Sequence, residues 1–288
     1  MTRRPEIIAV DAESPDDEVI AYAAGIIRGG GLVAMPTETV YGLAGSALDP
    51  ASIARIYEAK GRPRHNPLIA HVASLQQARE LAAEWPLMAD ELASRFWPGP
   101  LTLVLRRKAI VPDALTAGLD TFGARVPDHA VALALIEACG FPLAAPSANR
   151  FTEVSPVTAL QVARGLGKAV DLILDAGRTR VGIESTVVDV SGGRPVILRP
   201  GMISRTTVEA VVGPTGRPSQ VKREDEARPA PGMIARHYAP RARVVLFERT
   251  QFEDIQRDAA TRIAKGEALA LILSTLSQPR DFAVQVFF

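Results

Sequence analysis

The chain has 288 residues, of which 47% are hydrophobic and 23% are charged, and its formal net charge at pH 7 is +1. This length suits one large α/β domain, or a large domain with a small one. The near-zero charge argues against a protein that coats nucleic acid through bulk charge, although it leaves room for a local basic cleft. The single cysteine, Cys139, excludes an intramolecular disulfide framework, and no run of about eighteen apolar residues is present to span a membrane. We therefore expect a soluble protein of the cytoplasm.

Apolar runs and helical periodicity predict alternating strands and helices from the start of the chain. We expect strands at 7–10, 32–35, 68–72 and 101–105, and helices at 17–28, 52–59 and 74–84, with a further helix that reaches about Phe96. Asp16 or Asp17 can cap the first helix, and the three glycines at 29–31 end it.

The same pattern continues to about residue 212. We expect strands within 121–127 and at 142–145, 172–175, 185–190 and 196–198, and helices at 128–138, 155–164 and 206–212. Ser155 is predicted as the N-cap of the helix at 155–164, with Pro156 at its first position. A helix N-terminus is a natural anion site, so Ser155 could cap the helix and contact phosphate together.

The composition changes after residue 212. Residues 213–231 are rich in glycine and proline and predict a linker. Beyond it we expect a strand at 242–247, a helix at 252–264 and a strand at 268–273, whereas 281–288 is apolar without a clear element. The predicted organisation is a catalytic domain at 1–212, a linker or lid at 213–240, and a small or truncated α/β domain at 241–288.

A basic loop stands between a predicted helix and a predicted strand. Its sequence, residues 60–67, reads Lys-Gly-Arg-Pro-Arg-His-Asn-Pro and places three fixed cations next to an imidazole and an amide. Such a loop is well suited to hold phosphate oxygens. The alternative is a solvated surface loop, and for the loop taken alone this interpretation is the stronger one, because runs of charge usually face water.

Several other predicted strands end in polar residues. Thr37 and Thr39 follow the strand at 32–35, where they could contact a ligand or merely cap the next turn. Arg125 lies inside an otherwise apolar strand, and a buried arginine needs an anionic partner. That partner is either a protein carboxylate or a ligand carboxylate, and we favour the ligand. Arg199 places another guanidinium at a strand end.

The usual nucleophile and metal motifs are absent from the sequence. There is no G-x-S-x-G, C-x-x-C, H-E-x-x-H or G-x-x-x-x-G-K-[ST] pattern, and four histidines make an imidazole metal site improbable. The remaining inventory of Lys, Arg, Ser, Thr and Asn at strand ends suits polyanion binding, as in phosphoryl or nucleotidyl transfer.

Five motifs in order carry a family resemblance. They are Thr37-x-Thr39-x-Tyr41-Gly42-Leu43, Lys60-x-Arg62 with Asn66-Pro67-Leu68, Trp97-Pro98-Gly99-Pro100-x-Thr102, Ser147-x-Asn149, and Glu184-Ser185-Thr186-Val187-Val188-Asp189. Together they resemble the YrdC-like domain of threonylcarbamoyl-adenylate synthases over roughly residues 10–210, and the stretch 237–240 (His-Tyr-Ala-Pro) resembles the longer, two-domain branch. The resemblance implies an α/β fold with a twisted mixed sheet, parallel and antiparallel, flanked by helices, followed by a Rossmann-like unit that is small or incomplete.

The resemblance also implies a reaction in which L-threonine, bicarbonate and ATP give threonylcarbamoyl-AMP and pyrophosphate. By motif, the implied catalytic residues are Lys60 and Arg62, and the implied ATP contacts are Arg62, Asn66, Thr121, Ser147, Ser155, Arg199 and Tyr238. The implied threonine pocket is Thr39, His71, Arg125, Ala145 and Ser185, with Thr37 and Asn149 in support. Mg²⁺ would enter with ATP, held by phosphates and water rather than by a protein metal site. The intermediate would pass to a tRNA threonylcarbamoyltransferase complex, and the linker would close over it as a lid.

Two alternatives remain open. An RNA-binding module would use the basic cleft, although 5% aromatic residues and near-zero charge count against it. A carbamoyl-transfer enzyme of the same fold would act on another acceptor and would not depend on threonine.

Overall fold

The computed structural model describes residues 5–218, 230, 252–265, 269–274 and 282–287. The chain divides into two compact units, residues 1–239 and 240–288. Of the predicted linker, only residues 213–218 and 230 are described, and Tyr238 and the predicted strand at 242–247 lie outside the described residues. The domain boundaries at 212 and 240 therefore stay predictions.

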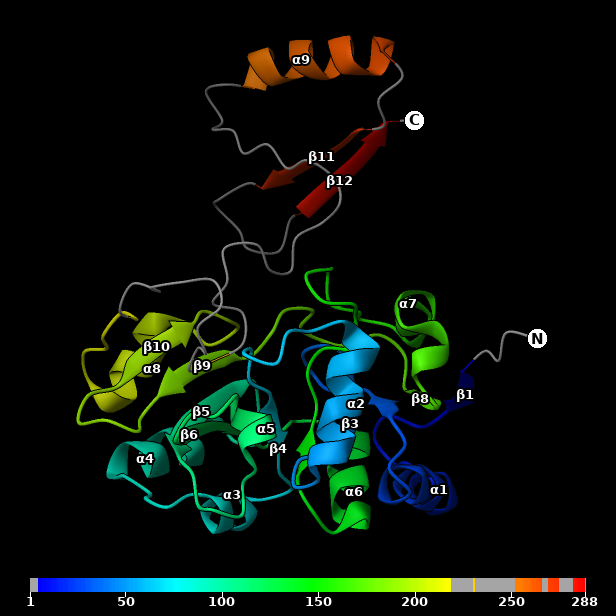
Figure 1. Ribbon diagram of the computed structural model, residues 1–288. Coiled ribbons are helices and arrows are strands. Elements are labelled where there is room, and N and C mark those ends of the chain that lie inside the picture. The colour runs from blue at the N-terminus through cyan, green and yellow to red at the C-terminus, as the bar shows by residue number, and fades with distance from the viewer. Residues whose placement is uncertain (1–4, 219–229, 231–251, 266–268, 275–281, 288) are drawn as a thin grey trace. The chain divides into compact units, whose positions relative to one another are not determined.

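A ten-stranded sheet forms the centre of the first unit, in the order β1-β8-β2-β3-β7-β4-β6-β5-β9-β10 (Figure 1). The pairs β1/β8, β2/β8, β4/β6 and β5/β9 are parallel, and β2/β3, β3/β7, β4/β7, β5/β6 and β9/β10 are antiparallel, which confirms the mixed sheet expected from the sequence. The strands are β1 (Glu6–Ala9), β2 (Val33–Met35), β3 (Gly42–Ser46), β4 (Ile69–His71), β5 (Leu101–Arg106), β6 (Thr121–Arg125), β7 (Leu143–Ala144), β8 (Leu172–Asp175), β9 (Thr186–Asp189) and β10 (Val196–Arg199).

Helices cover both faces of this sheet. Alternate residues of β2 belong to different cores, because Val33 and Met35 pack with α1 and α6 while Ala34 packs on the opposite face with α2. The helices are α1 (Asp17–Arg28), α2 (Pro50–Lys60), α3 (Leu75–Leu81), α4 (Leu87–Phe96), α5 (Asp113–Thr116), α6 (Ala130–Cys139), α7 (Ala159–Gly165) and α8 (Arg205–Val212), with a 3₁₀ turn η1 (Gly167–Ala169). Because both faces are covered, every residue of the central strands β2, β3, β7 and β4 is buried.

Helix α7 begins later than the sequence predicts, so the assignment of Ser155 as its N-cap is wrong. The cap is Thr158, whose side chain accepts a hydrogen bond from the Gln161 N–H at 3.3 Å. The Pro156 carbonyl accepts instead from the Tyr41 N–H at 2.9 Å, and the Ser155 hydroxyl donates to the Glu184 carboxylate. Both residues are thus used to join the loop before α7 to other segments.

Strand β3 was not expected, because its glycines and serine have low strand propensity. Close neighbours explain both glycines, since Gly45 lies against α2 and Gly42 lies against the residue that follows β7. A Cβ on Gly45 would lie 2.5 Å from the Ser52 Oγ, and one on Gly42 would lie 3.2 Å from the Ala145 Cβ. The short α5 was also missed.

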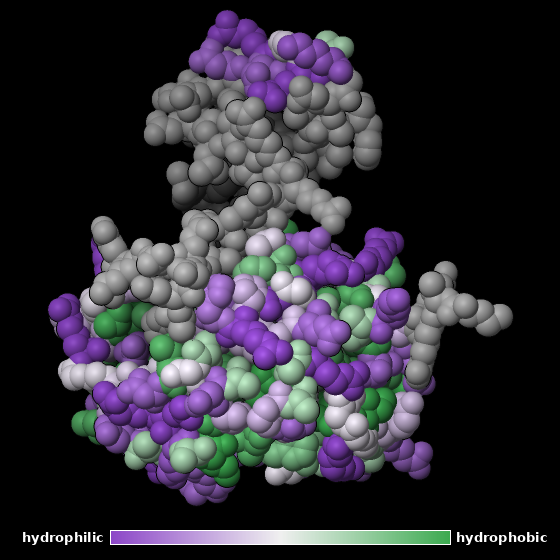
Figure 2. Space-filling view, in the orientation of Figure 1, coloured by the Kyte–Doolittle hydropathy of each residue, from purple (hydrophilic) through white to green (hydrophobic). Residues whose placement is uncertain are grey.

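The second unit contains α9 (Phe252–Ala264) and an antiparallel pair of strands, β11 (Leu269–Ser274) and β12 (Phe282–Phe287). The predicted helix and strand are confirmed here, and β12 forms where no element was expected. The surface of α9 is hydrophilic in Figure 2, and the side chains of Asp254 and Arg257 are exposed. None of the helices in the described part of the chain is both long and apolar enough to cross a bilayer.

The packing of α6 gives a test of the core. Leu135 on α6 is fully buried, whereas Leu160 on α7 is 54% exposed. We expect Leu135→Ala to lower the free energy of unfolding by about 2–5 kcal/mol, because the substitution leaves a cavity in a packed core. The matched Leu160→Ala control should change it by less than about 0.5 kcal/mol. Thermal denaturation of both variants measures the difference, and equal midpoints would contradict this placement of α6.

Candidate active site

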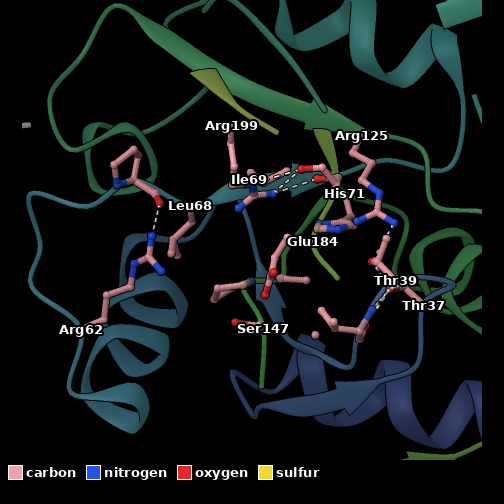
Figure 3. A pocket seen from close by; sticks show the side chains of 16 residues that line it. Thr37, Thr39, Arg62, Leu68, Ile69, His71, Arg125, Ser147, Glu184 and Arg199 are labelled. Atoms are coloured by element: carbon pink, nitrogen blue, oxygen red, sulfur yellow. Dashed lines mark hydrogen bonds between the residues drawn. The ribbon is translucent and has the colours of Figure 1, made fainter. Parts of the chain in front are cut away.

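A cavity lies where several strands of the first unit end (Figure 3). It encloses about 490 Å³, counting its opening to solvent, and most of its polar lining follows or closes a strand. Thr37 and Thr39 follow β2, His71 closes β4, Arg125 closes β6 and Arg199 closes β10. The remaining lining residues are Val40, Gly42, Arg62, Pro67, Leu68, Ile69, Ala145, Pro146, Ser147, Glu184 and Ser185.

The basic loop contributes Arg62 to this cavity. Helix α2 ends at Lys60 and is capped by Gly61, whose φ of 62° is in the left-handed region, and the chain then turns towards β4. The Arg62 Nη2 donates to the Asn66 Oδ1 and to the Pro67 carbonyl, both at 2.7 Å, and Nε donates to the Asn66 carbonyl at 3.0 Å. The loop thus folds around its own guanidinium. Asn66 lies behind Arg62, and its buried Nδ2 has no hydrogen-bond partner among the described residues.

Lys60 belongs to the wall of the site rather than to its lining. Its side chain is 2% exposed, and its ammonium donates to the carbonyl of Ser147 and, at 2.6 Å, to that of Asn149. Burial and the neighbouring Arg62 charge lower the pKa of Lys60 well below its ordinary value, while Glu184 opposes this shift. The ammonium therefore ties the end of α2 to the turn after β7, which presents Ser147 to the cavity.

Arg125 meets a protein carboxylate, which corrects our preference for a ligand as its partner. Its Nη2 lies 2.6 Å from the Glu38 Oε2 in a buried ion pair, donates to the Thr39 Oγ1 at 3.0 Å, and Nε donates to the Gly99 carbonyl at 3.2 Å. Nη1 makes no hydrogen bond to any residue that the structure describes. Because Arg125 also lines the cavity, one edge of the guanidinium remains available to a ligand.

His71 stands next to Arg125 in the register of β4 and β6. Burial, together with repulsion from Arg125, lowers the pKa of His71 to about 3. The imidazole is therefore neutral at pH 7, and its Nδ1 has no hydrogen-bond partner among the described residues. A neutral ring at this place can donate or accept a hydrogen bond without repelling a cation.

Hydroxyl groups complete the polar lining. Thr37 and Thr39 are joined through their Oγ1 atoms at 2.9 Å. The Ser185 Oγ lies 2.8 Å from the Thr102 Oγ1 and accepts from the Arg199 Nη2 at 3.0 Å. Arg199 also donates twice to the Ser185 carbonyl, so β10 holds the start of β9 in place.

Two carboxylates were not assigned a role from the sequence. Glu38 pairs with Arg125, and Glu184 lines the cavity with its Oε1 hydrogen-bonded by the Ser155 hydroxyl. Both stand inside motifs that contain site residues, next to Thr39 and Ser185. Each is an acidic residue inside a motif that otherwise suits anion binding, and this mismatch is the sequence signal that could have identified both.

The cavity brings together nine of the predicted site residues: Thr37, Thr39, Arg62, His71, Arg125, Ala145, Ser147, Ser185 and Arg199. Lys60, Asn66, Asn149 and Ser155 lie behind these through the contacts above. Thr121 lines a smaller neighbouring depression, which shares Pro67, Leu68 and Ile69 with the cavity. Tyr238 lies outside the described residues.

Known proteins resemble this chain over nearly its whole length. A family model described as "Telomere recombination", of the Sua5/YciO/YrdC group, matches residues 25–201, and one described as "Threonylcarbamoyl-AMP synthase, C-terminal domain" matches residues 203–286. The threonylcarbamoyl-AMP synthase of Pyrococcus abyssi is 48% identical over 93% of this chain and 79% of its own length. That of Bacillus subtilis is 45% identical over 86% of this chain and 72% of its own.

Solved structures agree with these matches. The crystal structure of P. abyssi Sua5 complexed with L-threonine has a TM-score of 0.85 and 46% identity, and the match covers 91% of this chain and 78% of that one. The structure of E. coli YciO has a TM-score of 0.62 and 26% identity, covering 69% and 96%. By family model and by relatives of 45–48% identity, this chain belongs to the Sua5/YciO/YrdC family of threonylcarbamoyl-AMP synthases.

Proposed function

We infer that this chain is a threonylcarbamoyl-AMP synthase, which converts L-threonine, bicarbonate and ATP into threonylcarbamoyl-AMP and pyrophosphate. The observation that carries the inference is the gathering of Arg62, Arg125 and Arg199 around one cavity. ATP and bicarbonate are anions and threonine brings a carboxylate, so guanidinium groups match all three. The names of the relatives, and the crystal structure of one with L-threonine, support the same activity.

The reaction asks the protein for positioning and for charge stabilisation. The amine of threonine first takes up CO2 or bicarbonate to form a carbamate, and a carbamate oxygen then attacks the α-phosphate in line with the departing pyrophosphate. Negative charge grows on the leaving group, and fixed cations stabilise it without reorganising at the moment of reaction. No covalent intermediate with the protein is required.

The phosphate end of the cavity is proposed to consist of Arg62, Arg199 and Ser147. Asn66 would orient Arg62 through the hydrogen bond that its Oδ1 accepts. Lys60 would hold the turn that carries Ser147 in place through the hydrogen bonds of its ammonium group. The further ATP contacts proposed from the motifs are Thr121, Ser155 and Tyr238, with Asn149 in support.

The threonine end is proposed to lie around Arg125. Its free edge would take the substrate carboxylate, while Glu38 and Thr39 fix the other edge. His71, Ala145 and Ser185 would surround the remainder of the amino acid, and Thr37 supports Thr39 through their hydroxyl contact. Because Glu38 and Thr39 already hold Arg125, the position of its guanidinium does not depend on a substrate being bound.

Mg²⁺ is proposed to arrive with the nucleotide. Within the described residues, no group of three or more His, Cys, Asp or Glu side chains is arranged to hold a metal ion. Phosphate oxygens and water are therefore the proposed ligands, in keeping with the preference of Mg²⁺ for such coordination.

The product is a reactive mixed anhydride, so a partner must use it promptly. We propose transfer to a tRNA threonylcarbamoyltransferase complex in the cytoplasm. Direct tRNA binding and carbamoyl transfer to another acceptor are the less favoured alternatives, since the similar proteins are named threonylcarbamoyl-AMP synthases and one of them has a crystal structure with L-threonine.

Pyrophosphate release tests the activity directly. We expect release from ATP to require both threonine and bicarbonate, because the attacking carbamate is built from both. Each substrate is left out in turn while pyrophosphate is measured in a coupled assay. Release that continues without threonine would contradict the proposed function and favour a different carbamoyl acceptor.

Two arginines of the basic loop, one buried and one exposed, provide a matched pair of positions for mutation. Arg62 is buried and lines the cavity, whereas Arg64, two residues on, is exposed. Arg62→Ala should lower kcat/KM for ATP by about 100-fold or more, because it removes a positioned charge at the phosphates. Arg64→Ala should stay within about twofold, as expected for a surface charge. Steady-state kinetics of both variants separate a phosphate-binding role from a merely solvated loop.

The role of Arg125 is best tested together with Glu38, since removing one partner of a buried ion pair costs about 3–5 kcal/mol of stability. The double variant Arg125→Gln/Glu38→Gln should raise the KM for threonine by about 100-fold while ATP affinity changes little. The exposed ion pair Arg106–Asp120 provides the control, as Arg106→Gln/Asp120→Asn. Unchanged threonine KM in the first double variant would place the substrate carboxylate elsewhere.

A further inference from the structure

Glu184 is the one carboxylate among the described residues that line the cavity. Three guanidinium groups, a neutral imidazole and several hydroxyls make up the other polar lining. Figure 3 shows the Glu184 side chain projecting into the middle of the cavity, between Arg62 on one side and His71 with Arg125 on the other. A carboxylate in this position repels phosphate and attracts a cationic group on a substrate.

Two later residues, Arg199 and Gly201, hold the backbone at and just after Glu184. Arg199 donates to the carbonyl of the next residue, Ser185, at 2.9 and 3.1 Å. Gly201 lies against the same segment, because a Cβ on it would come within 2.5 Å of the Glu184 carbonyl. The Ser155 hydroxyl orients Oε1, and Oε2 makes no hydrogen bond to any residue that the structure describes. One carboxylate oxygen is thus held and the other is available.

Threonine carries a cationic group of its own, the α-ammonium, whereas the Mg²⁺ proposed to accompany ATP would be held by phosphate oxygens and water. Resting on the function proposed above, an amino acid whose carboxylate binds Arg125 carries its ammonium into the same cavity. An ammonium group has no lone pair and cannot attack carbon until it loses a proton. We propose that Glu184 binds the α-ammonium of threonine and accepts its proton as the carbamate forms, which makes it a catalytic residue of the first step.

The proton balance of this step is simple. Threonine ammonium and bicarbonate give the carbamate, water and one proton. The N–C bond forms, the bond from carbon to the departing hydroxide breaks, and one proton from nitrogen joins that hydroxide as water. The second proton from nitrogen goes to the Glu184 Oε2, which returns it to solvent through the opening of the cavity.

Other bases near the cavity are unsuited to this role. Glu38 is buried against Arg125 and does not line the cavity. The imidazole of His71, with a pKa of about 3, cannot hold a proton at neutral pH. Lys60 is committed to the carbonyls of Ser147 and Asn149.

The test is the pH dependence of Glu184→Gln, with Glu58→Gln as a control for loss of an exposed carboxylate. At neutral pH the variant should lose about 100-fold or more in kcat/KM for threonine, the usual contribution of a general base. Its rate should then rise by about tenfold per pH unit towards the pKa of the free amine, because only unprotonated threonine can react. The wild type should show a shallower rise.

Two kinetic results would overturn the proposal: a Glu184→Gln enzyme within about threefold of wild type at neutral pH, or a loss that is the same at every pH. The second would indicate that Glu184 only holds Ser155. Pyrophosphate release by the wild type without threonine would instead contradict the proposed function itself. That measurement uses no variant, so the two failures can be told apart.

A binding measurement tests the ammonium contact without turnover. 2,3-Dihydroxybutyrate carries a hydroxyl where threonine carries its ammonium. With an unreactive ATP analogue and no bicarbonate, the wild type should prefer threonine to this acid by about tenfold or more. Glu184→Gln should lose the preference while still binding the nucleotide, which also shows that it is folded. A preference that survives in the variant would refute the contact.

Discussion

Positive charge buried beneath the cavity is the constraint around which the site is built. Lys60, Arg62 and Arg125 are each less than 7% exposed, and a buried cation is costly unless oxygen atoms of the protein surround it. The chain supplies these oxygens from its own backbone: the carbonyls of the turn after β7, of the basic loop itself and of Gly99. Segments distant in the sequence are thereby held together by the same charges that make the cavity attractive to anions.

This arrangement also explains how the arginines are aimed before a substrate arrives. A guanidinium has five N–H donors in a rigid fork, and the protein occupies some of them. In Arg125, Glu38 and Gly99 hold one part of the fork, and the remaining edge lines the cavity. Preorganised donors of this kind need not reorient as charge develops, which is the main source of electrostatic catalysis.

The sequence predicted the general architecture because periodicity reports burial. The bounds of α1 and α9 follow from apolar spacing and from caps such as Asp16, and strand ends with polar residues pointed to the cavity. It failed where long-range contacts override local preference. Glycines weaken the strand signal of β3, but Gly45 admits the approach of α2 and Gly42 that of Ala145. Ser155 was taken for a cap because its contact with Glu184 cannot be seen from spacing alone.

The partners of charged groups were the least predictable part of the site. Arg125 was recognised as needing an anion, but a motif does not show whether that anion is Glu38 or a ligand. Lys60 was assigned a catalytic role by its motif, while the carbonyls that surround it lie in a turn far along the chain. Backbone acceptors carry no sequence signal, so their pairing emerges only from the folded sheet.

The lining of the cavity is drawn from almost the whole first unit, from Thr37 after β2 to Arg199 at the end of β10. The edge pair β9 and β10, last in the sheet order and late in the chain, supplies Glu184, Ser185 and Arg199 at or beside its ends. During synthesis the lining therefore stays incomplete until β9 and β10 have emerged. Substrates that need the whole lining bind only the finished sheet, and by binding it they stabilise the folded state over the unfolded one.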